Sequence, residues 1–446
     1  MVVMAALSSL LLVLAFPKFS LYPLSLVALV PLIILSFKEP SPRRRFLYGF
    51  LAGIVFFSGI CYWIYTVMKT FGGLGAVAAG GVFVLFCVTL ACYFGLFVWL
   101  SGYLWKLSWG PAVIPLLWVS LELARAHLVT GFPWLLLGYA ATDFFALARV
   151  ARWTGVYGLS YLIISINVGL AWLWLRGKNK FPLWFLAAHT TLILAVVLTA
   201  SRQVYPEDQK VFLVQTQIPQ ELALEPWDYS SQQPLLERLE QLTLSSIGRQ
   251  DPPALIIYPE MPAHFYFWDD SFTRPFFESL ARRTNSYLVS GIVAFKRDSG
   301  RSQPLNSALL LNPTGDFVSQ HDKLHLVPFG EYVPLKDWLW FANALTGEVS
   351  DFVPGEKIVI SPIPGGHLGS LICYEAIFPN LTRQFARDGA EVLVNISNDG
   401  WYGSSAARDQ HLLMSRMRAI ENGRYLLRST NTGLTAVIRP DGSIAA

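Results

Sequence analysis

Leu368-Gly-Ser-Leu-Ile-Cys-Tyr-Glu-Ala-Ile-Phe378 is the stretch around which the C-terminal half of the chain is organised. Its apolar run predicts a buried strand that ends at Cys373, and Pro379 directly after the stretch is typical of the first turn of a helix. The other cysteines, Cys61, Cys87 and Cys92, lie in strongly apolar N-terminal segments. A lone cysteine at a strand end is usually a small buried hydrophobic residue, so a chemical role depends on which residues join it.

The composition divides the chain into two regions. Of 446 residues, 53% are hydrophobic and only 14% are charged, against about 25% charged in an average soluble domain. Residues 1–201 hold long apolar runs, whereas residues 202–446 have the composition of a globular domain. We therefore expect a transmembrane domain followed by a globular domain. The net charge of +4 carries little information, and we expect no nucleic-acid partner.

The apolar half contains about seven stretches that approach the length of a membrane span, which is about 20 residues. The first stretch lacks the basic start and the small-residue cleavage site of a signal peptide, so we interpret it as a true span. The predicted spans are residues 2–20, 21–37, 46–68, 74–102, 110–130, 155–175 and 181–201.

Basic residues in the connecting loops predict the orientation of these spans, because cytoplasmic loops are enriched in lysine and arginine. One side of the membrane receives most of them: Lys38, Arg43, Arg44, Arg45, Lys106, Arg176, Lys178 and Lys180. Arg149 and Arg152 lie on the other side and are a minority against this bias. This bias places the N-terminus in the cytoplasm and residues 202 onward on the outer face of the membrane.

A mixed polar and aromatic segment stands out near one predicted boundary. It contains Glu122, Arg125, Thr130-Gly-Phe-Pro-Trp134 and Gly138-Tyr139. One interpretation is an interfacial aromatic belt with a paired charge. The other is a re-entrant loop that shapes an entrance for lipid.

The globular half alternates short apolar strands with amphipathic segments, a pattern typical of a mixed α/β domain built from layers of sheets and helices. The predicted strands are 210–218, 254–258, 286–295, 306–311, 316–322, 357–360, 368–372, 391–396, 425–429 and 435–438. The predicted helices are 231–247, 271–283, 380–388 and 408–421.

Glu260, Lys323 and Cys373 each lie at or just after a strand end, where functional side chains collect on α/β scaffolds. Each residue also has an ordinary explanation when it is considered alone. Glu260 could lie in a solvated turn, Lys323 could form a surface ion pair with Asp322, and Cys373 could be a buried thiol. Taken together, they form a chemical set. A thiol is mostly protonated near neutral pH, so it needs a base such as Glu260 and a cation such as Lys323. The set predicts cysteine acyl chemistry without a catalytic histidine.

The order of the motifs resembles the nitrilase superfamily, whose triad is Glu, Lys, Cys in an αββα sandwich. With apolar spans in front, the chain resembles the apolipoprotein N-acyltransferases of the bacterial inner membrane. The matching motifs are Thr130-Gly-Phe-Pro-Trp134, Val214-Gln-Thr-Gln-Ile-Pro219, Tyr258-Pro-Glu260, Asn306-Ser-Ala308, Asp322-Lys-Leu324, Val327-Pro-Phe-Gly-Glu331, Ile372-Cys-Tyr-Glu375, Asn395-Ile-Ser-Asn-Asp-Gly-Trp401 and Thr430-Asn-Thr-Gly433.

The resemblance implies a two-step reaction without a cofactor or metal, carried out by a monomer whose catalytic domain faces the periplasm. Cys373 would take an acyl chain from a phospholipid as a thioester. The α-amine of a diacylglyceryl-cysteine at the N-terminus of an apolipoprotein would then accept it. Glu260 would be the general base and Lys323 the oxyanion stabiliser.

The same resemblance implies supporting residues. Glu331 would be a second acid near the lysine, and Tyr374 and Glu375 would flank the nucleophile. Asn306, Trp227 and Trp401 would contact the substrate, the two tryptophans by lining the entrance or the acyl pocket.

Three alternatives remain open on the sequence. The first is a membrane-tethered nitrilase-type amidase, and the second is a transporter or scaffold with a degenerate domain. The third is a zinc site through His321 and His325, although the sequence contains no HExxH motif. The family also continues with more of the sandwich and an eighth span, so we expect the chain to lack that part beyond Ala446.

Overall fold

The computed structural model describes the chain except for residues 176–180, 200–206, 208, 220–228, 248–251, 262–264, 299–300 and 334–351. The chain divides into two compact units. The helical unit comprises Met1–Gln203 and Ser404–Glu421, and the sheet unit comprises Val204–Gly403 and Asn422–Ala446. Helix α15 (Ala407–Asn422) therefore groups mainly with the helical unit, although it lies far along the C-terminal half of the sequence.

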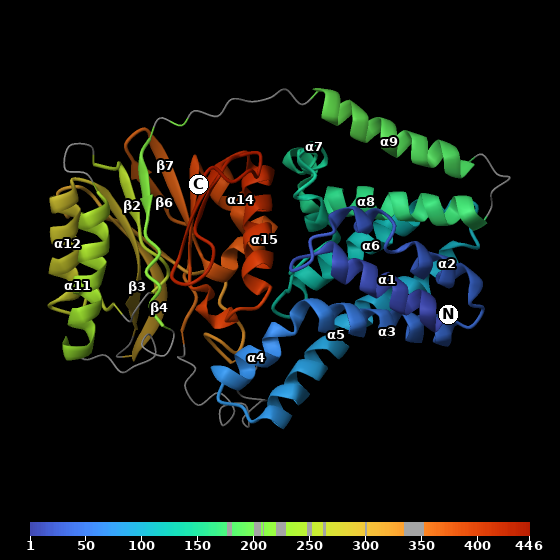
Figure 1. Cartoon of the computed structure of the whole chain (residues 1–446), viewed down its shortest axis with the longest axis horizontal. Helices are drawn as coiled ribbons and strands as arrows, with labels where there is room; N and C mark the ends of the chain where they lie inside the picture. The colour runs from blue at the N-terminus through green and yellow to red at the C-terminus, as the bar shows by residue number, and fades with distance from the viewer. Residues whose placement is uncertain are drawn as a thin grey trace. The chain divides into compact units, whose positions relative to one another are not determined.

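The helical unit is built from apolar helices joined by short connections (Figure 1). They are α1 (Val2–Ala15), η1 (Tyr22–Leu26), α2 (Val30–Lys38), α3 (Pro42–Cys61), α4 (Trp63–Thr70), α5 (Ala76–Leu104), α6 (Gly110–His127), η2 (Leu137–Ala141), α7 (Phe145–Ala148), α8 (Ala151–Leu175) and α9 (Phe181–Thr199). Among the described residues, three helices, α3, α5 and α8, are long and apolar enough to cross a membrane. Shorter apolar helices cover Val2–Ala15, Tyr22–Lys38 and Phe181–Val196.

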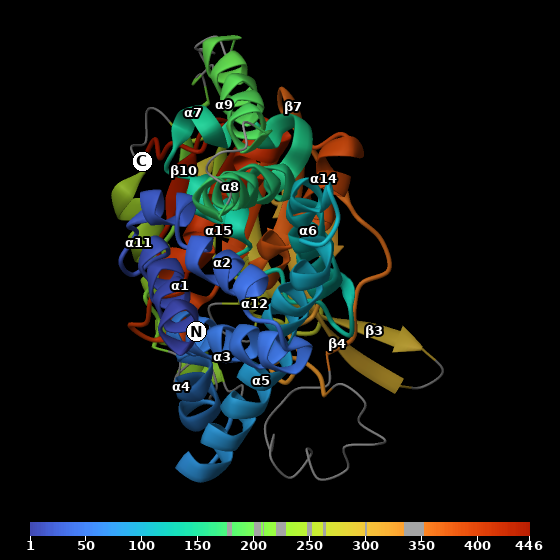
Figure 2. The ribbon, with the colours of Figure 1, turned by 90° about the vertical axis from the view of Figure 1, so that its right-hand side faces the viewer.

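Helices α3 and α5 lie side by side in both views of the ribbon (Figures 1 and 2). Small residues allow this close approach. A Cβ atom at Gly53 would lie 2.7 Å from the Cα atom of Ala91, and one at Gly49 would lie 2.5 Å from the backbone oxygen of Phe94. Glycine at helix contacts is typical of membrane helices, where dispersion forces between closely packed backbones drive association.

The sheet unit contains two five-stranded sheets, with strand orders β1-β2-β3-β4-β5 and β10-β9-β8-β7-β6. The strands are β1 (Val211–Leu213), β2 (Leu255–Ile257), β3 (Tyr287–Asp298), β4 (Arg301–Leu311), β5 (Phe317–Asp322), β6 (Ile360–Ile363), β7 (Gly366–Ile372), β8 (Val392–Ser397), β9 (Tyr425–Thr430) and β10 (Ala436–Ile438). The helices of this unit are α11 (Tyr229–Ser246), α12 (Thr273–Thr284) and α14 (Pro379–Arg387), with the short turns η3 (Cys373–Ile377) and η4 (Asp399–Tyr402).

Two apolar clusters hold these layers together. One packs α11 and α12 against the first sheet, with Phe277 and Leu280 fully covered. The other fills the space between the sheets, where Ile257 of β2 and Ile372 of β7 belong to the same buried cluster. Helix α14 lies on the opposite side of the sheets from α11 and α12 (Figure 1). The predicted combination of a helical membrane domain with an αββα sandwich is confirmed.

Three predicted strands differ clearly from the observed ones. The strand expected at 306–311 begins earlier, at Arg301, where it pairs with Asp298 of β3. The strand expected at 210–218 is shorter, Val211–Leu213, and the extended backbone is lost by Gln217, whose φ is +50°. The strand expected at 357–360 lies later, at Ile360–Ile363. Its register is set by the turn at Pro364-Gly365, which pairs Ile363 with Gly366 of β7. In a hairpin such as β6–β7, the turn type and the loop length fix the register of the two strands.

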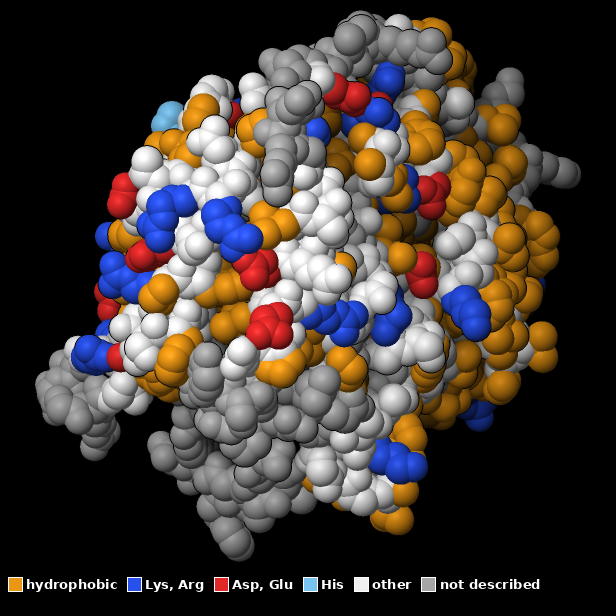
Figure 3. All heavy atoms as spheres, turned by 60° about the vertical axis from the view of Figure 1, so that its left-hand side comes forward, with side chains coloured by type: hydrophobic (Ala, Val, Ile, Leu, Met, Phe, Trp, Pro, Cys, Tyr) orange, Lys and Arg blue, Asp and Glu red, His pale blue; other side chains and the backbone are white. Residues whose placement is uncertain are grey.

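Large exposed apolar side chains are concentrated in the helical unit, among them Val77, Val129 and Trp184. In the described part of the sheet unit, they are limited to Trp268, Phe272, Phe317, Phe329 and Ile444. On the face drawn in Figure 3, one side mixes acidic and basic side chains, whereas the other is mainly hydrophobic. The helical unit therefore has the surface of a protein that meets lipid.

Candidate active site

Glu260, Lys323 and Cys373 follow β2, β5 and β7, respectively, and all three are buried in the sheet unit. Gly291 of β3 leaves room for the first of them. A Cβ atom at this position would lie 2.8 Å from the Cα atom of Glu260. The glycine therefore allows the backbone that carries Glu260 to pack directly on the neighbouring strand.

Lys323 lies between two carboxylates. Its Nζ is 2.8 Å from Oε1 of Glu331 and 3.3 Å from Oε1 of Glu260. Burial alone would lower the pKa of Lys323, but the charges of Glu331 and Glu260 outweigh it and raise the pKa above its usual range. The lysine is therefore a fixed positive charge at neutral pH.

Asn306 holds the same two carboxylates together. Its Nδ2 donates hydrogen bonds to Oε1 of Glu260 at 2.9 Å and to Oε1 of Glu331 at 2.8 Å. The backbone N–H of Asn398 donates to the other oxygen of Glu260 at 2.9 Å, and that of Val327 to the other oxygen of Glu331 at 2.7 Å. Each carboxylate is thus oriented through both oxygens, which keeps Glu260 fixed.

Cys373 opens the turn η3 in a conformation that is unusual for its residue type. Its φ is +50°, in the left-handed region that favours glycine. Burial raises the pKa of the thiol, the negative charge of Glu260 raises it further, and the positive charge of Lys323 opposes this. The raised pKa favours the thiol over the thiolate, so the sulfur needs a base to take its proton.

Glu375 connects the strand that carries the cysteine to the segment that carries the lysine. Its carboxylate accepts hydrogen bonds from the backbone N–H of Ile372 at 2.7 Å, of Leu324 at 2.7 Å and of His325 at 3.3 Å. His321 lies 3.8 Å from the same carboxylate. Although burial would raise the pKa of Glu375, these contacts lower it. Glu375 therefore links the backbone just before Cys373 to the backbone just after Lys323.

The remaining predicted residues lie further out. Tyr374 is buried, and its ring packs at 5.1 Å on Phe378 and at 5.9 Å on His325. Trp401 is half-buried in η4, and Trp227 lies outside the described residues.

Sequence reasoning did not assign a role to a group behind the cysteine. Ser397 ends β8, Asp399 follows in η4, and Arg428 lies in β9. Asp399 and Arg428 form a fully buried ion pair of 2.7 Å. The sequence signal was the polar run Ser397-Asn-Asp399 at the end of an apolar strand, which is the same kind of signal that pointed to Glu260 and Cys373.

A zinc site through His321 and His325 would need further ligands beside them. In the described part of the chain, no group of three or more histidine, cysteine or acidic side chains is placed to hold a metal ion. The ring of His325 instead packs on Phe378, with 3.8 Å between the ring centres.

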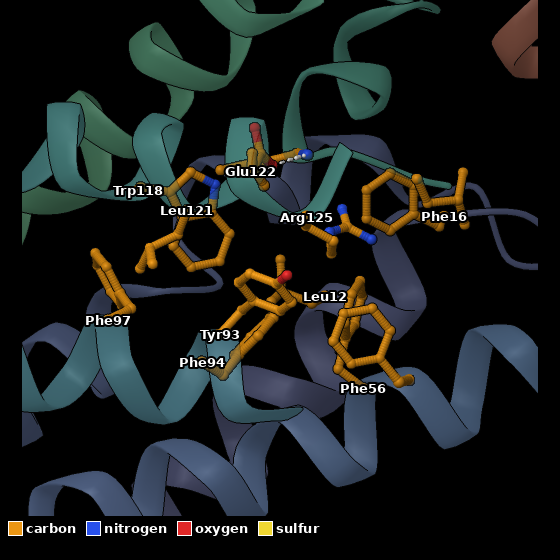
Figure 4. A pocket seen from close by; sticks show the side chains of 13 residues that line it. Leu12, Phe16, Phe56, Tyr93, Phe94, Phe97, Trp118, Leu121, Glu122 and Arg125 are labelled. Atoms are coloured by element: carbon orange, nitrogen blue, oxygen red, sulfur yellow. Dashed lines mark hydrogen bonds between the residues drawn. The ribbon is translucent and has the colours of Figure 1, made fainter. Parts of the chain in front are cut away.

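The mixed segment of the helical unit is buried. Trp134 and Tyr139 are fully covered, so they do not form an exposed aromatic belt. Arg125 donates to the backbone oxygen of Trp134 at 2.9 Å, and Glu122 accepts from the N–H of Leu137 at 2.7 Å. Figure 4 shows both charged side chains among aromatic rings that line a small pocket. The two charges thus satisfy non-helical backbone, which membrane proteins tolerate only where it is buried.

Comparison with known proteins decides the family. A family model described as the apolipoprotein N-acyltransferase N-terminal domain matches residues 8–169, and one described as carbon-nitrogen hydrolase matches residues 210–446. The apolipoprotein N-acyltransferase of Geobacter metallireducens is 38% identical over 99% of this chain and 85% of its own length. The chain belongs to the apolipoprotein N-acyltransferase family.

Other relatives agree with this membership, so the predicted resemblance is confirmed. The apolipoprotein N-acyltransferase of Nitrosomonas europaea is 31% identical over 96% of this chain and 85% of its own length. Among solved structures, Saccharomyces cerevisiae Nit3, a member of branch 10 of the nitrilase superfamily, is 21% identical, with a TM-score of 0.40. That match covers 55% of this chain and 88% of Nit3.

Proposed function

We propose that this member of the apolipoprotein N-acyltransferase family moves an acyl chain from a phospholipid to the α-amine of an apolipoprotein's diacylglyceryl-cysteine. One observation carries the proposal. A buried lysine lies between two oriented carboxylates in the same site as a cysteine with a left-handed backbone. Backbone strain of this kind collects at functional sites.

In the first step, Glu260 takes the proton of the Cys373 thiol, and the sulfur attacks the ester carbonyl of the phospholipid. Lys323 stabilises the negative oxygen of the tetrahedral intermediate. The carbon–oxygen bond then breaks, and the leaving lysophospholipid oxygen receives the proton from Glu260. The products are a thioester on Cys373 and a lysophospholipid with a free hydroxyl group.

In the second step, the lipoprotein amine attacks the thioester carbonyl, and Glu260 takes a proton from the attacking nitrogen. The carbon–sulfur bond breaks, an amide forms, and the thiolate of Cys373 recovers a proton from Glu260. The reaction consumes no water and needs no cofactor, so transfer depends on keeping water from the thioester.

We assign the supporting roles from the contacts around Lys323. Glu331 and Asn306 orient the lysine and the base through the hydrogen bonds described above. Glu375 sets the spacing between Lys323 and Cys373. Tyr374 flanks the nucleophile. Trp227 and Trp401 are proposed to contact the substrate.

Both proposed substrates are anchored in lipid, which accounts for the helical unit with its candidate spans. The charge bias of the loops supports the proposal that the catalytic domain, residues 202–446, faces the periplasm from a bacterial inner membrane. Labelling of whole cells with a membrane-impermeant amine reagent tests this orientation, because Lys210 and Lys296 of the sheet unit would react from outside.

The deciding experiment is the intact mass of the protein in detergent after mixing with one defined phospholipid. We expect a mass gain of one acyl chain that hydroxylamine removes and that Cys373→Ala abolishes. Cys92→Ala, in the helical unit, should leave the adduct unchanged. A diacylated lipopeptide should discharge the thioester. A protein that leaves the phospholipid intact but hydrolyses small amides would instead be an amidase.

A further inference from the structure

A chain of buried polar groups runs from the sulfur of Cys373 into the second sheet. Ser397 Oγ lies 3.4 Å from Cys373 Sγ and 2.9 Å from Asp399 Oδ1. The other oxygen of Asp399 accepts from Arg428 at 2.7 Å, and Arg428 also donates to Oδ1 of Asn395. Apart from Cys373, which is 6% exposed, every member of this chain is fully buried.

Ser397 cannot donate a hydrogen bond to Cys373 and to Asp399 at the same time. A hydroxyl carries one hydrogen and can also accept. When Cys373 is a thiol, its S–H can donate to Ser397 Oγ, while Ser397 donates to the carboxylate of Asp399. When the sulfur is a thiolate, it needs a donor, and the Ser397 hydroxyl is within reach.

We propose that Ser397 is a catalytic residue whose hydroxyl turns from Asp399 to the sulfur of Cys373 when the thiolate forms. The inference rests on the proposed function only in taking Cys373 as the nucleophile. The thiol proton passes to Glu260, whereas the hydroxyl proton stays on Ser397 throughout. Asp399 and Arg428 are positioning residues that hold the hydroxyl toward the carboxylate until the thiol ionises.

The surroundings explain why Asp399 can lose this hydrogen bond. The negative charge of Asp399 remains balanced by Arg428. The backbone of Gly433 also packs closely on this carboxylate, since a Cβ atom at position 433 would lie 2.6 Å from Asp399 Oδ2. Asn395 ties the same network to the nucleophile, because its Nδ2 donates to the backbone oxygens of Leu371 at 3.1 Å and Cys373 at 3.4 Å.

Several charged or titratable groups face the sulfur and share in setting its ionisation. They are Glu260 after β2, Lys323 after β5, and Asp399 and Tyr402 of η4. Ser397 at the end of β8 faces the sulfur as a neutral hydrogen-bonding group. Arg428 of β9 and Tyr374 of η3 act on the same cluster through Asp399 and Tyr402. Ser397 can thus redirect its hydroxyl hydrogen from Asp399 to the sulfur without any change in its own charge.

The test is the rate at which iodoacetamide alkylates Cys373 as a function of pH, with the site located by peptide mass. We expect Ser397→Ala to move the profile to higher pH and to slow alkylation at neutral pH by at least about 10-fold, the effect of losing one hydrogen bond to a charged group. Ser397→Thr keeps the hydroxyl and should restore the rate to within about 3-fold.

Ser429→Ala is the matched control. Ser429 is equally buried in the neighbouring strand, but its hydroxyl donates to the backbone oxygen of Val214 at 2.8 Å. Its profile should match the wild type. A Ser397→Ala profile that superimposes on the wild type would overturn the inference. So would an equal shift in Ser429→Ala, because the effect would then be structural.

Asp399→Asn predicts the opposite shift. The new amide would donate to Ser397 Oγ and free the hydroxyl for the sulfur, so alkylation should rise at lower pH. Ser397→Ala and Ser397→Thr leave the Asp399–Arg428 pair intact, and they decide the question if Asp399→Asn fails to fold.

Alkylation needs no lipid, so the two proposals can fail separately. A shifted alkylation profile without any acyl-enzyme would retain Ser397 and reject the transferase. Normal acyl-enzyme formation in Ser397→Ala, at the wild-type rate, would reject the role of Ser397 and retain the transferase.

Discussion

The indole N–H of Trp134 donates a 2.7 Å hydrogen bond to the side-chain oxygen of Gln410, although 276 residues separate them. The amide nitrogen of Gln410 donates to the backbone oxygens of Pro17 at 3.0 Å and Ile60 at 3.1 Å. One residue of α15 therefore satisfies polar groups from three distant stretches of the helical unit. Because Gln410 is fully buried, no water replaces these bonds easily.

Gln410→Leu should destabilise the helical unit. The substitution leaves a buried indole N–H and two carbonyl oxygens without this partner, and each such loss costs about 1–3 kcal/mol. We expect unfolding in detergent, followed by tryptophan fluorescence, to reveal a loss of at least about 2 kcal/mol. Asp409→Ala, at the exposed neighbouring position, should change stability by no more than about 0.5 kcal/mol. Equal effects of the two variants would contradict the prediction.

Asn306→Asp should lower the transfer rate sharply with little change in side-chain volume. It replaces the donor between Glu260 and Glu331 with a third acceptor, so one carboxyl must hold a proton or turn away. We expect kcat/KM to fall by at least about 100-fold, or about 2.7 kcal/mol. Partial recovery at lower pH should follow, because a protonated carboxyl can donate. A pH-independent loss would argue against this role for Asn306.

Cys373→Gly should be more stable than Cys373→Ala, although both lack the nucleophile. The left-handed backbone at this position, with φ of +50°, costs a residue with a Cβ atom about 1 kcal/mol that glycine avoids. Thermal unfolding of the two variants under one set of conditions measures the difference. A lower midpoint for the glycine variant would show that the backbone there is not strained.

Glu375→Gln should change how stability depends on pH. The pKa of Glu375 is lowered on folding: burial raises it, but the contacts from His321 and the backbone donors outweigh burial. A depressed carboxyl stabilises the fold above its unfolded pKa of about 4.3, and this contribution disappears as the pH falls through the folded value. Urea unfolding should therefore reveal a large difference from the wild type at neutral pH that narrows below about pH 4.

The control for this prediction is Glu237→Gln on the exposed face of α11, where the carboxylate accepts a 2.8 Å hydrogen bond from Gln233. Its stability should follow the wild type across the same pH range. If the difference between Glu375→Gln and the wild type stayed constant from neutral to acid pH, the ionised carboxylate would not be the stabilising form.

The sequence determined the division into an apolar and a globular half, the order of most helices and strands, and the family. These features depend on local patterns. Apolar runs and alternating residues record which faces are buried, and Pro379 marks the start of α14 where expected. The strand ends also pointed to Glu260, Lys323 and Cys373 as candidates, and their catalytic roles stay a prediction.

Tertiary structure alone decided the features that depend on contacts between distant residues. It placed α15 in the helical unit through Gln410, stopped β1 at Leu213, and set Ser397 within reach of the sulfur of Cys373. A buried hydrogen bond leaves no periodic trace in the sequence, because its partners are matched in space and not in spacing along the chain.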